Sequence, residues 1–374
     1  MRHHTVLPRV AALAAALVLT ACGASPTANT GGGNEAAANA AAKAQAVYDR
    51  INGLTGDERR KALVDLAEKE GKLSIYTSNT DMDSLVAGFE KAYKINVSVY
   101  RGNSESVLQR VLQEHQANYF GNDFMDTNAG ELNIMNKEGL FYPYKGELRD
   151  AVRKDGQANG WTASRFNVFV VGWNTSKVKP GEEPKSFEEL ADPKWKGQVS
   201  MEVSDVDWFA GLYKYYLDQG KSEAEVRDLF TRIAANSKVA KGHTTQGELL
   251  SAGQFAITVS SYSHTIDKAA DKGAPVSWHP ASGTPIQPIV LRPNGVALMK
   301  TATNPAAAML FADWELTEGQ KILAKAFRIG SIPGAKDPLT GLKVVAVPEQ
   351  ELLADPKKWD RLYADIVQAG QEIK

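Results

Sequence analysis

GKLSIYTSNTDMDSLVAGFEKAYKINVSVYRGNSESVLQRVLQEHQ, residues 71–116, sets the architecture of this chain. Residues 73–76 alternate apolar and polar side chains as a strand does, and Thr80 with Asp83 three residues on predicts a capped helix after them. Residues 95–99 alternate again, and a second helix follows the turn at Gly102. Strand, helix, strand, helix is the order that produces a parallel sheet.

The same alternation continues along the chain and predicts an α/β fold class with two α/β lobes. We expect strands at 123–126, 198–203 and 255–260, with helices between them and after them. Residues 166–173 form a long apolar run, which predicts a strand that is buried on both faces or bridges the two lobes. Residues 289–299 predict two extended pieces around a Pro-Asn-Gly turn, and the chain finishes with helices.

The only cysteine, Cys22, follows an apolar amino-terminal run at residues 10–19. That run is too short to span a bilayer as a mature helix, which needs about 20 apolar residues. The Thr-Ala pair before the cysteine resembles the lipobox of bacterial lipoproteins, in which cleavage precedes the cysteine and its thiol is acylated. We therefore expect a lipoprotein signal peptide at 1–21 and a lipid anchor on Cys22. An ordinary secretory signal with an incidental cysteine is the alternative.

Composition narrows the class of protein. The 374 residues contain 43 Lys and Arg against 44 Asp and Glu, so the chain is nearly neutral, which argues against a nucleic-acid partner. One cysteine permits no intramolecular disulfide. Residues 22–43 are rich in alanine, asparagine and glycine, which predicts a flexible tether before the folded body begins at Ala44.

Several short motifs, in order along the chain, carry a family resemblance. They are EGKLSIYTS at 70–78, FEKAY at 89–93, VGWNT at 171–175, FEELADPKWKG at 187–197 and NPAAAMLF at 304–311. Together they resemble extracellular solute-binding proteins of bacterial ABC importers, in the branch that includes the ferric-iron binders. The resemblance spans nearly the whole mature chain.

That resemblance implies a type II periplasmic-binding-protein fold, with two α/β lobes joined by hinge strands and a ligand in the cleft between them. It places the first lobe at 44–168 with 286–325, the second lobe at 169–285, and a carboxyl-terminal segment, 326–374, across both lobes. The expected partners are a small-molecule or ion ligand, an ABC permease and, through the lipid, the membrane. We expect a monomer on the extracytoplasmic face of the cell membrane.

Two groups of ligand-binding candidates lie in or beside the first lobe. Thr77, Ser78 and Asn79 follow a parallel strand and precede a helix, where backbone N–H groups and hydroxyls converge on oxygen-rich ligands. A capping role is the alternative for Thr80, next to them. Arg165, directly before the apolar run 166–173, could hold a carboxylate or phosphate with both arms of its guanidinium. An ion pair within the protein is the alternative for Arg165.

The remaining candidates lie in the second lobe. Thr244 and Thr245 lie in a loop ahead of a predicted helix at 246–252, with capping of that helix as their alternative role, and Ser261 and Tyr262 follow a strand. In ferric-iron relatives this second region carries adjacent tyrosines whose phenolates suit a trivalent cation, whereas here Tyr262 stands alone. We therefore predict a small oxygen-rich solute, with a phosphonate, a phosphate ester or a carboxylate as the anionic candidates, and Tyr262 as a metal ligand only if the solute is ferric iron.

A secreted hydrolase is the alternative function, because a cleft between lobes can also hold catalytic groups. The sequence contains no Gly-x-Ser-x-Gly elbow, His-Glu-x-x-His helix or Walker-type phosphate loop. The histidines beyond Cys22 show no short metal-ligand spacing. A binding protein with no catalytic residue, no cofactor and no resident metal is therefore the prediction.

Overall fold

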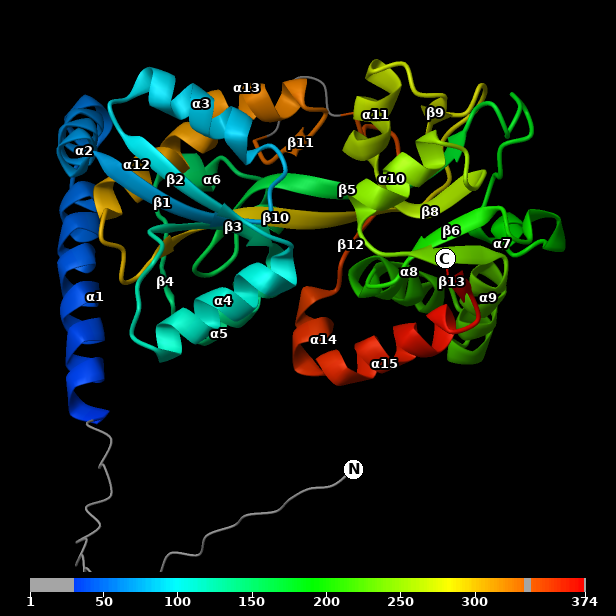
Figure 1. Cartoon of the computed structure of the whole chain (residues 1–374), viewed down its shortest axis with the longest axis horizontal. Helices are drawn as coiled ribbons and strands as arrows, with labels where there is room; N and C mark the ends of the chain where they lie inside the picture. The colour runs from blue at the N-terminus through cyan, green and yellow to red at the C-terminus, as the bar shows by residue number, and fades with distance from the viewer. Residues whose placement is uncertain (1–29, 333–337, 373–374) are drawn as a thin grey trace, which may run out of the picture.

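The computed structural model describes residues 30–332 and 338–372, which form two α/β lobes side by side (Figure 1). The first lobe holds α1 Thr30–Asn52, α2 Gly56–Glu70, β1 Lys72–Thr77, α3 Met82–Ala92, β2 Asn96–Arg101, α4 Ser104–Gln116, β3 Phe124–Asn128, α5 Ala129–Lys137, β4 Phe141–Tyr142, α6 Glu147–Asp150, α12 Pro305–Glu315 and α13 Glu318–Lys325. The second lobe holds α7 Phe187–Leu190, β6 Val199–Glu202, α8 Val206–Asp218, α9 Glu223–Ala235, β7 Ser237–Ala240, α10 His243–Ser251, β8 Ile257–Tyr262, α11 Ser263–Asp271 and β9 Val276–Ser277. The predicted α/β architecture with two lobes is confirmed.

Two long strands, β5 Thr162–Asn174 and β10 Ile289–Met299, run from one lobe to the other (Figure 1). They join the lobes into one sheet with the order β13-β7-β6-β8-β5-β10-β3-β1-β2. The outer strands of each lobe pair in parallel, while β5 and β10 pair antiparallel with each other and with their neighbours β8 and β3 in this order. Every residue of β5 and β10 is buried, which explains why both segments are so apolar.

The strand β10 corrects one prediction. Residues 289–299 were expected as two extended pieces around Pro293, but they form one strand. The register against β5 shifts between Asn294 and Gly295, so the turn-like sequence produces a bulge instead of a break. The same pairing sets Asn294 opposite Arg165 on β5 and opposite Asn128 on β3, which brings three polar residues together where the lobes meet.

The helix α1 also differs from the prediction, since residues 30–43 are helical where a flexible tether was expected. Alanine-rich sequence has high helix propensity, and the last turns of α1 have a surface to pack on. Ala44, Tyr48 and Ile51 are buried, and the Tyr48 hydroxyl donates a 3.1 Å hydrogen bond to the Met299 carbonyl. The signal segment and Cys22 lie outside the described residues.

The carboxyl-terminal segment contains β11 Ile329–Gly330, β12 Val344–Ala346, α14 Glu349–Ala354, α15 Pro356–Val367 and β13 Gln371–Glu372. The helix α14 contacts α5 of the first lobe, and α15 packs on α8 and α9 of the second. Trp359, Tyr363 and Ile366 form the buried face of α15. Within the described ranges, no helix combines the length and the apolar character that a bilayer crossing needs.

Candidate functional site

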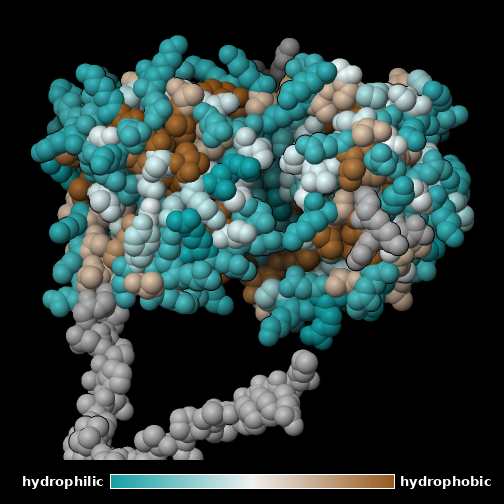
Figure 2. Space-filling view, in the orientation of Figure 1, coloured by the Kyte–Doolittle hydropathy of each residue, from teal (hydrophilic) through white to brown (hydrophobic). Residues whose placement is uncertain are grey.

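A cavity of about 1140 Å³ separates the two lobes, and Figure 2 shows the molecule hollowed there, with mostly hydrophilic walls. We call this cavity the cleft. Its walls come from the carboxyl ends of strands and the helix starts that follow them, as is usual for ligand sites in α/β folds. The first lobe and the hinge strands contribute Ser78, Asn79, Thr80, Asp81, Arg101, Gly102, Asn103, Ser104, Asn128, Arg165, Asn167 and Asn294. The second lobe contributes residues of α10 and α11 with their flanks, and the turn after α13 contributes Lys325 to Arg328.

The cleft brings together five of the predicted ligand-binding residues, namely Ser78, Asn79, Arg165, Thr244 and Tyr262. The structure does not place the other three on its walls. Thr77 is buried beneath the loop, where its hydroxyl accepts a 2.8 Å hydrogen bond from the Asn79 backbone N–H. Ser261 precedes Tyr262 on β8, and successive strand residues face opposite sides of the sheet. Because Tyr262 lines the cleft, Ser261 faces the other side, where it is buried. The helix α10 begins at His243, so Thr244 and Thr245 lie in its first turn and not in a loop ahead of it, and Thr245 is exposed there.

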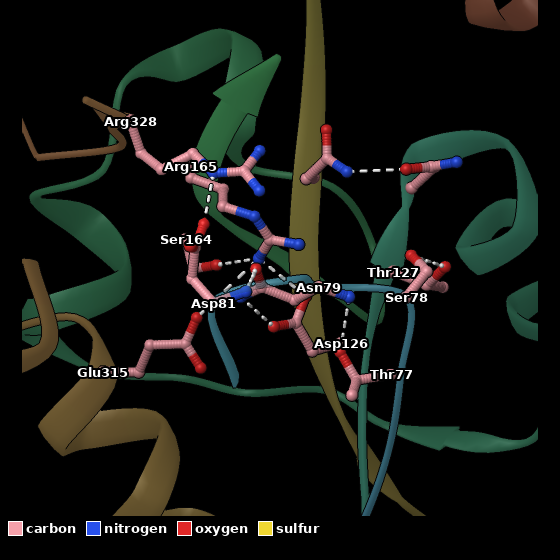
Figure 3. A network of polar contacts seen from close by, with 12 residues as sticks. Thr77, Ser78, Asn79, Asp81, Asp126, Thr127, Ser164, Arg165, Glu315 and Arg328 are labelled. Carbon is pink, nitrogen blue, oxygen red and sulfur yellow. Dashed lines mark hydrogen bonds and ion pairs between the residues drawn. The ribbon is translucent and has the colours of Figure 1, made fainter. Parts of the chain in front are cut away.

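Arg165 forms a buried ion pair at the floor of the cleft (Figure 3). Its Nη1 lies 2.6 Å from Asp126 Oδ1, and the side chains are 1% and 0% exposed. Asn79 donates a second hydrogen bond to Asp126, at 3.1 Å. The Nε–H of Arg165 has no hydrogen-bond partner among the residues that the structure describes, so the guanidinium keeps a buried donor that a ligand oxygen could accept from. The ion pair and the ligand role proposed for Arg165 are therefore compatible.

Asp81 and Arg328 form a second ion pair, which no pattern in the sequence indicated. Arg328 Nε donates to Asp81 Oδ2 at 2.7 Å, and its Nη2 donates to the Thr80 hydroxyl at 3.0 Å. Lys268 of the second lobe donates to Asp81 Oδ1 at 2.5 Å. Burial opposes ionisation of Asp81, but the charge of Arg328 and the hydrogen bonds from Lys268 and Arg328 lower its pKa below the usual value.

These contacts correct the predicted capping box. The N-cap of α3 is Asp81, with no side-chain hydrogen bond to the helix, and Thr80 serves as an acceptor for Arg328 instead of capping. The charged partners of Asp81 come from positions 187 and 247 residues away in sequence, so the local pattern alone could not reveal them. The Asp81–Lys268 contact also ties the first lobe to the second across the cleft.

Arg292 organises the second-lobe side of the cleft. Its Nη2 donates to the Tyr262 hydroxyl at 2.6 Å, and its Nη1 pairs with Asp207 Oδ2 at 2.9 Å. The centroid of the Tyr262 ring lies 3.7 Å from that of the His243 ring and 5.4 Å from that of the His264 ring. Burial raises the pKa of Tyr262 although the charge of Arg292 opposes this shift, so the phenol keeps its proton at neutral pH. An arginine inside the apolar segment 289–299 was the sequence signal for this residue.

The buried carboxyl group of Glu315 lies beside the Arg165–Asp126 ion pair beneath the cleft, and its protonation changes with pH. Its Oε1 lies 4.0 Å from Arg165 Nη1 (Figure 3). Burial, with the charge of Asp126 adding to it, raises the pKa of Glu315 from 4.5 to about 8. The folded protein therefore binds a proton here that the unfolded chain has already released at neutral pH.

The free energy of unfolding of the parent protein should fall between about pH 4.5 and pH 8 as Glu315 becomes ionised. We expect Glu315→Gln to remove this part of the pH dependence. A raised pKa means that the stability contribution is present below the unfolded pKa and is lost as pH rises through the folded pKa. The neutral amide cannot ionise, so the variant should be more stable than the parent at pH 8 and close to it at pH 4.5. Urea unfolding at several pH values measures this, and parallel stability curves for the two proteins would contradict it. Exposed Glu318→Gln, from the start of α13, is the matched control and should leave the pH profile unchanged.

Comparisons with known proteins bear on this arrangement. A family model described as "Bacterial extracellular solute-binding protein" matches residues 107–362. The chain is 26% identical over 283 residues to iron uptake protein A1 of Synechocystis sp., covering 70% of this chain and 76% of that protein.

Solved structures also resemble this fold. Iron-bound HitA from Pseudomonas aeruginosa matches with a TM-score of 0.66 and 18% identity, over 79% of this chain and 99% of HitA. The periplasmic binding protein AfuA from Actinobacillus pleuropneumoniae, with exogenous fructose-6-phosphate bound, matches with a TM-score of 0.67 and 21% identity, over 80% of this chain and 99% of AfuA. The expected type II periplasmic-binding-protein fold is thus confirmed.

The family assignment decides between a solute-binding protein and a secreted hydrolase, the two function classes that the sequence left open. A family of solute receptors gives no support to a secreted hydrolase, so the protein is a binding protein and not an enzyme. The two lobes, the hinge strands and the polar cleft are the parts that such a receptor needs. The chain belongs to the bacterial extracellular solute-binding proteins.

Proposed function

We propose that this protein captures a small anionic, oxygen-rich solute in the cleft and delivers it to an ABC permease. The observation that carries the proposal is the charge of the cleft walls. Among the described lining residues, six are cationic, Arg101, Arg165, Lys268, Lys272, Lys325 and Arg328, and three are anionic, Asp81, Glu248 and Asp271. A cleft with this excess of positive charge attracts anions and holds them through charge-assisted hydrogen bonds.

Helix starts support the same class of solute. The N-cap residues of α5, α10 and α11 line the cleft, namely Asn128, Gly242 and Tyr262, and none of them makes a side-chain hydrogen bond to its helix. The first backbone N–H groups of a helix have no partner within the helix, and they favour anionic ligands. The bound fructose-6-phosphate in AfuA is a phosphate ester, a solute of the same chemistry in a protein of the same fold.

Ferric iron is the second candidate, because iron uptake protein A1 and iron-bound HitA are relatives or fold neighbours. Tyr262 with His243 and His264 beside it is the cluster that could contact a cation. Its hydroxyl, however, accepts a hydrogen bond from Arg292, and its raised pKa disfavours the phenolate that ferric iron prefers. Among the described residues, no group of three or more His, Cys, Asp or Glu side chains is arranged to hold a metal ion. The anionic solute therefore fits this cleft better.

Calorimetry and thermal denaturation of the purified mature protein test the proposal. The probes are inorganic phosphate, glycerol 3-phosphate, citrate, ferric chloride with and without citrate, glucose and spermidine. A ligand at one hundred times its Kd stabilises the folded state by about 2.7 kcal/mol, so a binding probe should raise Tm by several degrees. We expect a phosphate or carboxylate probe to bind, with an affinity that falls as salt rises. Binding of glucose or spermidine alone would contradict the proposal, and binding of ferric chloride without an anion would favour the second candidate.

Lobe closure supplies the signal to the permease in this proposal. We take the lobes to be residues 44–168 with 286–325 and residues 169–285, moving about β5 and β10. The contact between Asp81 and Lys268 joins the two lobes at the cleft, so a solute held between them changes the balance between open and closed forms. A closed form has a surface that a permease can distinguish from the open one.

The lipid anchor on Cys22 completes the proposal, because it keeps the receptor beside its permease. We expect Cys22→Ala to abolish incorporation of labelled fatty acid and to move the protein from the membrane fraction to the soluble fraction. Each buried CH₂ of an acyl chain contributes about 0.8 kcal/mol, so the loss of the chains removes the hold on the membrane. Ser25→Ala, three residues further on, is the control. Labelling that persists in the Cys22 variant would refute the anchor.

A further inference from the structure

Phe327 occupies a backbone position that favours glycine. It follows the last turn of α13 with a φ of +58°. The Phe327 N–H donates to the Ala324 carbonyl and the Arg328 N–H donates to the Leu323 carbonyl, which is the Schellman pattern that ends helices. The left-handed residue of this motif is usually glycine, because a side chain at that position meets the backbone.

Elsewhere in the described part of the chain, positive φ occurs at glycines and at one asparagine. Asn118 is the other non-glycine residue with positive φ in the described part, and asparagine tolerates the left-handed conformation. A bulky aromatic residue does not, so Phe327 lowers the stability of this turn. Such strain persists where the residue contributes something else, often at a ligand site.

Burial of the Phe327 ring in the core does not compensate for the backbone strain of this turn. Its side chain is 38% exposed, and it lies on the wall of the cleft and of a neighbouring cavity of about 780 Å³. The other wholly apolar side chains among the described lining residues of the cleft are the alanines Ala252, Ala269 and Ala326. The cleft therefore presents one large hydrocarbon surface among polar and charged groups.

The adjacent residue, Arg328, supplies a charged contact next to this apolar ring. Arg328 is 8% exposed, lines the cleft and is fixed by Asp81 and Thr80. Lys268 of the second lobe meets Asp81 at the same place. An aromatic ring next to a fixed cationic pair is suited to a solute that carries an anionic group and a planar apolar group close together.

We propose that Phe327 is a specificity-determining contact of the cleft, whose ring packs on the planar apolar part of an anionic solute held through Arg328 and Lys268. This inference rests on the proposed function and narrows its substrate class to aryl or heteroaryl phosphates and carboxylates. The gain from a ring contact is about tenfold in affinity, since aromatic pairs add 0.5–1.5 kcal/mol beyond area burial.

The test compares phenyl phosphate, glycerol 3-phosphate and inorganic phosphate by calorimetry on the mature protein and on F327A, F327G and F327Y. The parent and F327Y should bind phenyl phosphate about tenfold more tightly than glycerol 3-phosphate. F327A and F327G should both lose this preference while binding of inorganic phosphate stays within about twofold. A phenyl phosphate preference that survives in F327A and F327G overturns the inference alone. An equal loss for all three probes assigns the ring to contact between the lobes and also overturns it.

Stability measurements separate the binding role from the backbone strain. In urea unfolding, F327G should have a folding equilibrium constant about fivefold above that of F327A, because glycine adopts positive φ freely. The same pair at Asn118, N118G and N118A, calibrates this backbone effect away from the cleft and should leave all affinities unchanged. F327G then has the relaxed turn without the ring, so its lost preference for phenyl phosphate cannot come from strain. Failure of every phosphate probe to bind the parent protein overturns the proposed function together with this inference.

Discussion

Replacing Arg165 with methionine is expected to lower the free energy of unfolding by about 3–5 kcal/mol. Methionine has a similar length and leaves no large cavity, so the loss comes from the charge. Asp126 would then be a fully buried carboxylate whose remaining side-chain contact is the 3.1 Å hydrogen bond from Asn79. Removing one partner of a buried ion pair is far more costly than removing an exposed pair, because the other charge stays uncompensated.

The Arg165→Met,Asp126→Asn double variant distinguishes this explanation from simple loss of packing. If the uncompensated carboxylate causes the damage, the double variant should recover about 2 kcal/mol relative to Arg165→Met, although one more side chain has been changed. Urea unfolding of the parent, both single variants and the double variant gives the coupling energy. Losses that simply add would show that Arg165 acts through packing alone.

The α/β architecture was predictable because it depends on local periodicity. In residues 71–116, alternation of period two marks β1 and β2 within two residues of their observed ends, and the helical spacing of apolar residues indicates α3 and α4 after them. Burial of β5 and β10 on both faces appears in the sequence as mostly apolar segments, which Arg165 and Asn167 interrupt in β5 and residues 292–295 interrupt in β10. The helical start of α1 was missed, since its alanines and glycines resemble a linker and its stability depends on packing against the first lobe.

The candidate site was less predictable, because its charged residues meet only through tertiary structure. Ser78 and Asn79 follow β1, and Tyr262 is the last residue of β8, so a general rule on strand ends could find them. Arg328 and Lys268 lie after or within helices with no local feature that separates them from surface cations. Only the pairing of β11 with β5 and the packing of α11 beside the cleft place them around Asp81.

Replacing Arg328 with glutamine is expected to weaken binding of glycerol 3-phosphate about a hundredfold. The substitution removes a cation that is 8% exposed on the cleft wall, and it also leaves Asp81 balanced by Lys268 alone. The Asp81 carboxylate would then repel an incoming anion where the parent protein attracts one. Truncating one partner of a buried, hydrogen-bonded charge pair costs 2–5 kcal/mol, which corresponds to this loss of affinity.

The matched control is Arg59→Gln in the first lobe, outside the residues that line the cleft. Arg59 also holds a carboxylate, Asp313, with both arms of its guanidinium at 2.5 and 3.3 Å. It should lose about 1 kcal/mol of stability and no affinity. Arg328→Lys keeps the charge without the two-armed geometry and should lie between the parent and Arg328→Gln. Affinity of Arg328→Gln within threefold of the parent would place the anion elsewhere, since a ligand held by Arg328 must lose both its attraction and its partner for hydrogen bonding.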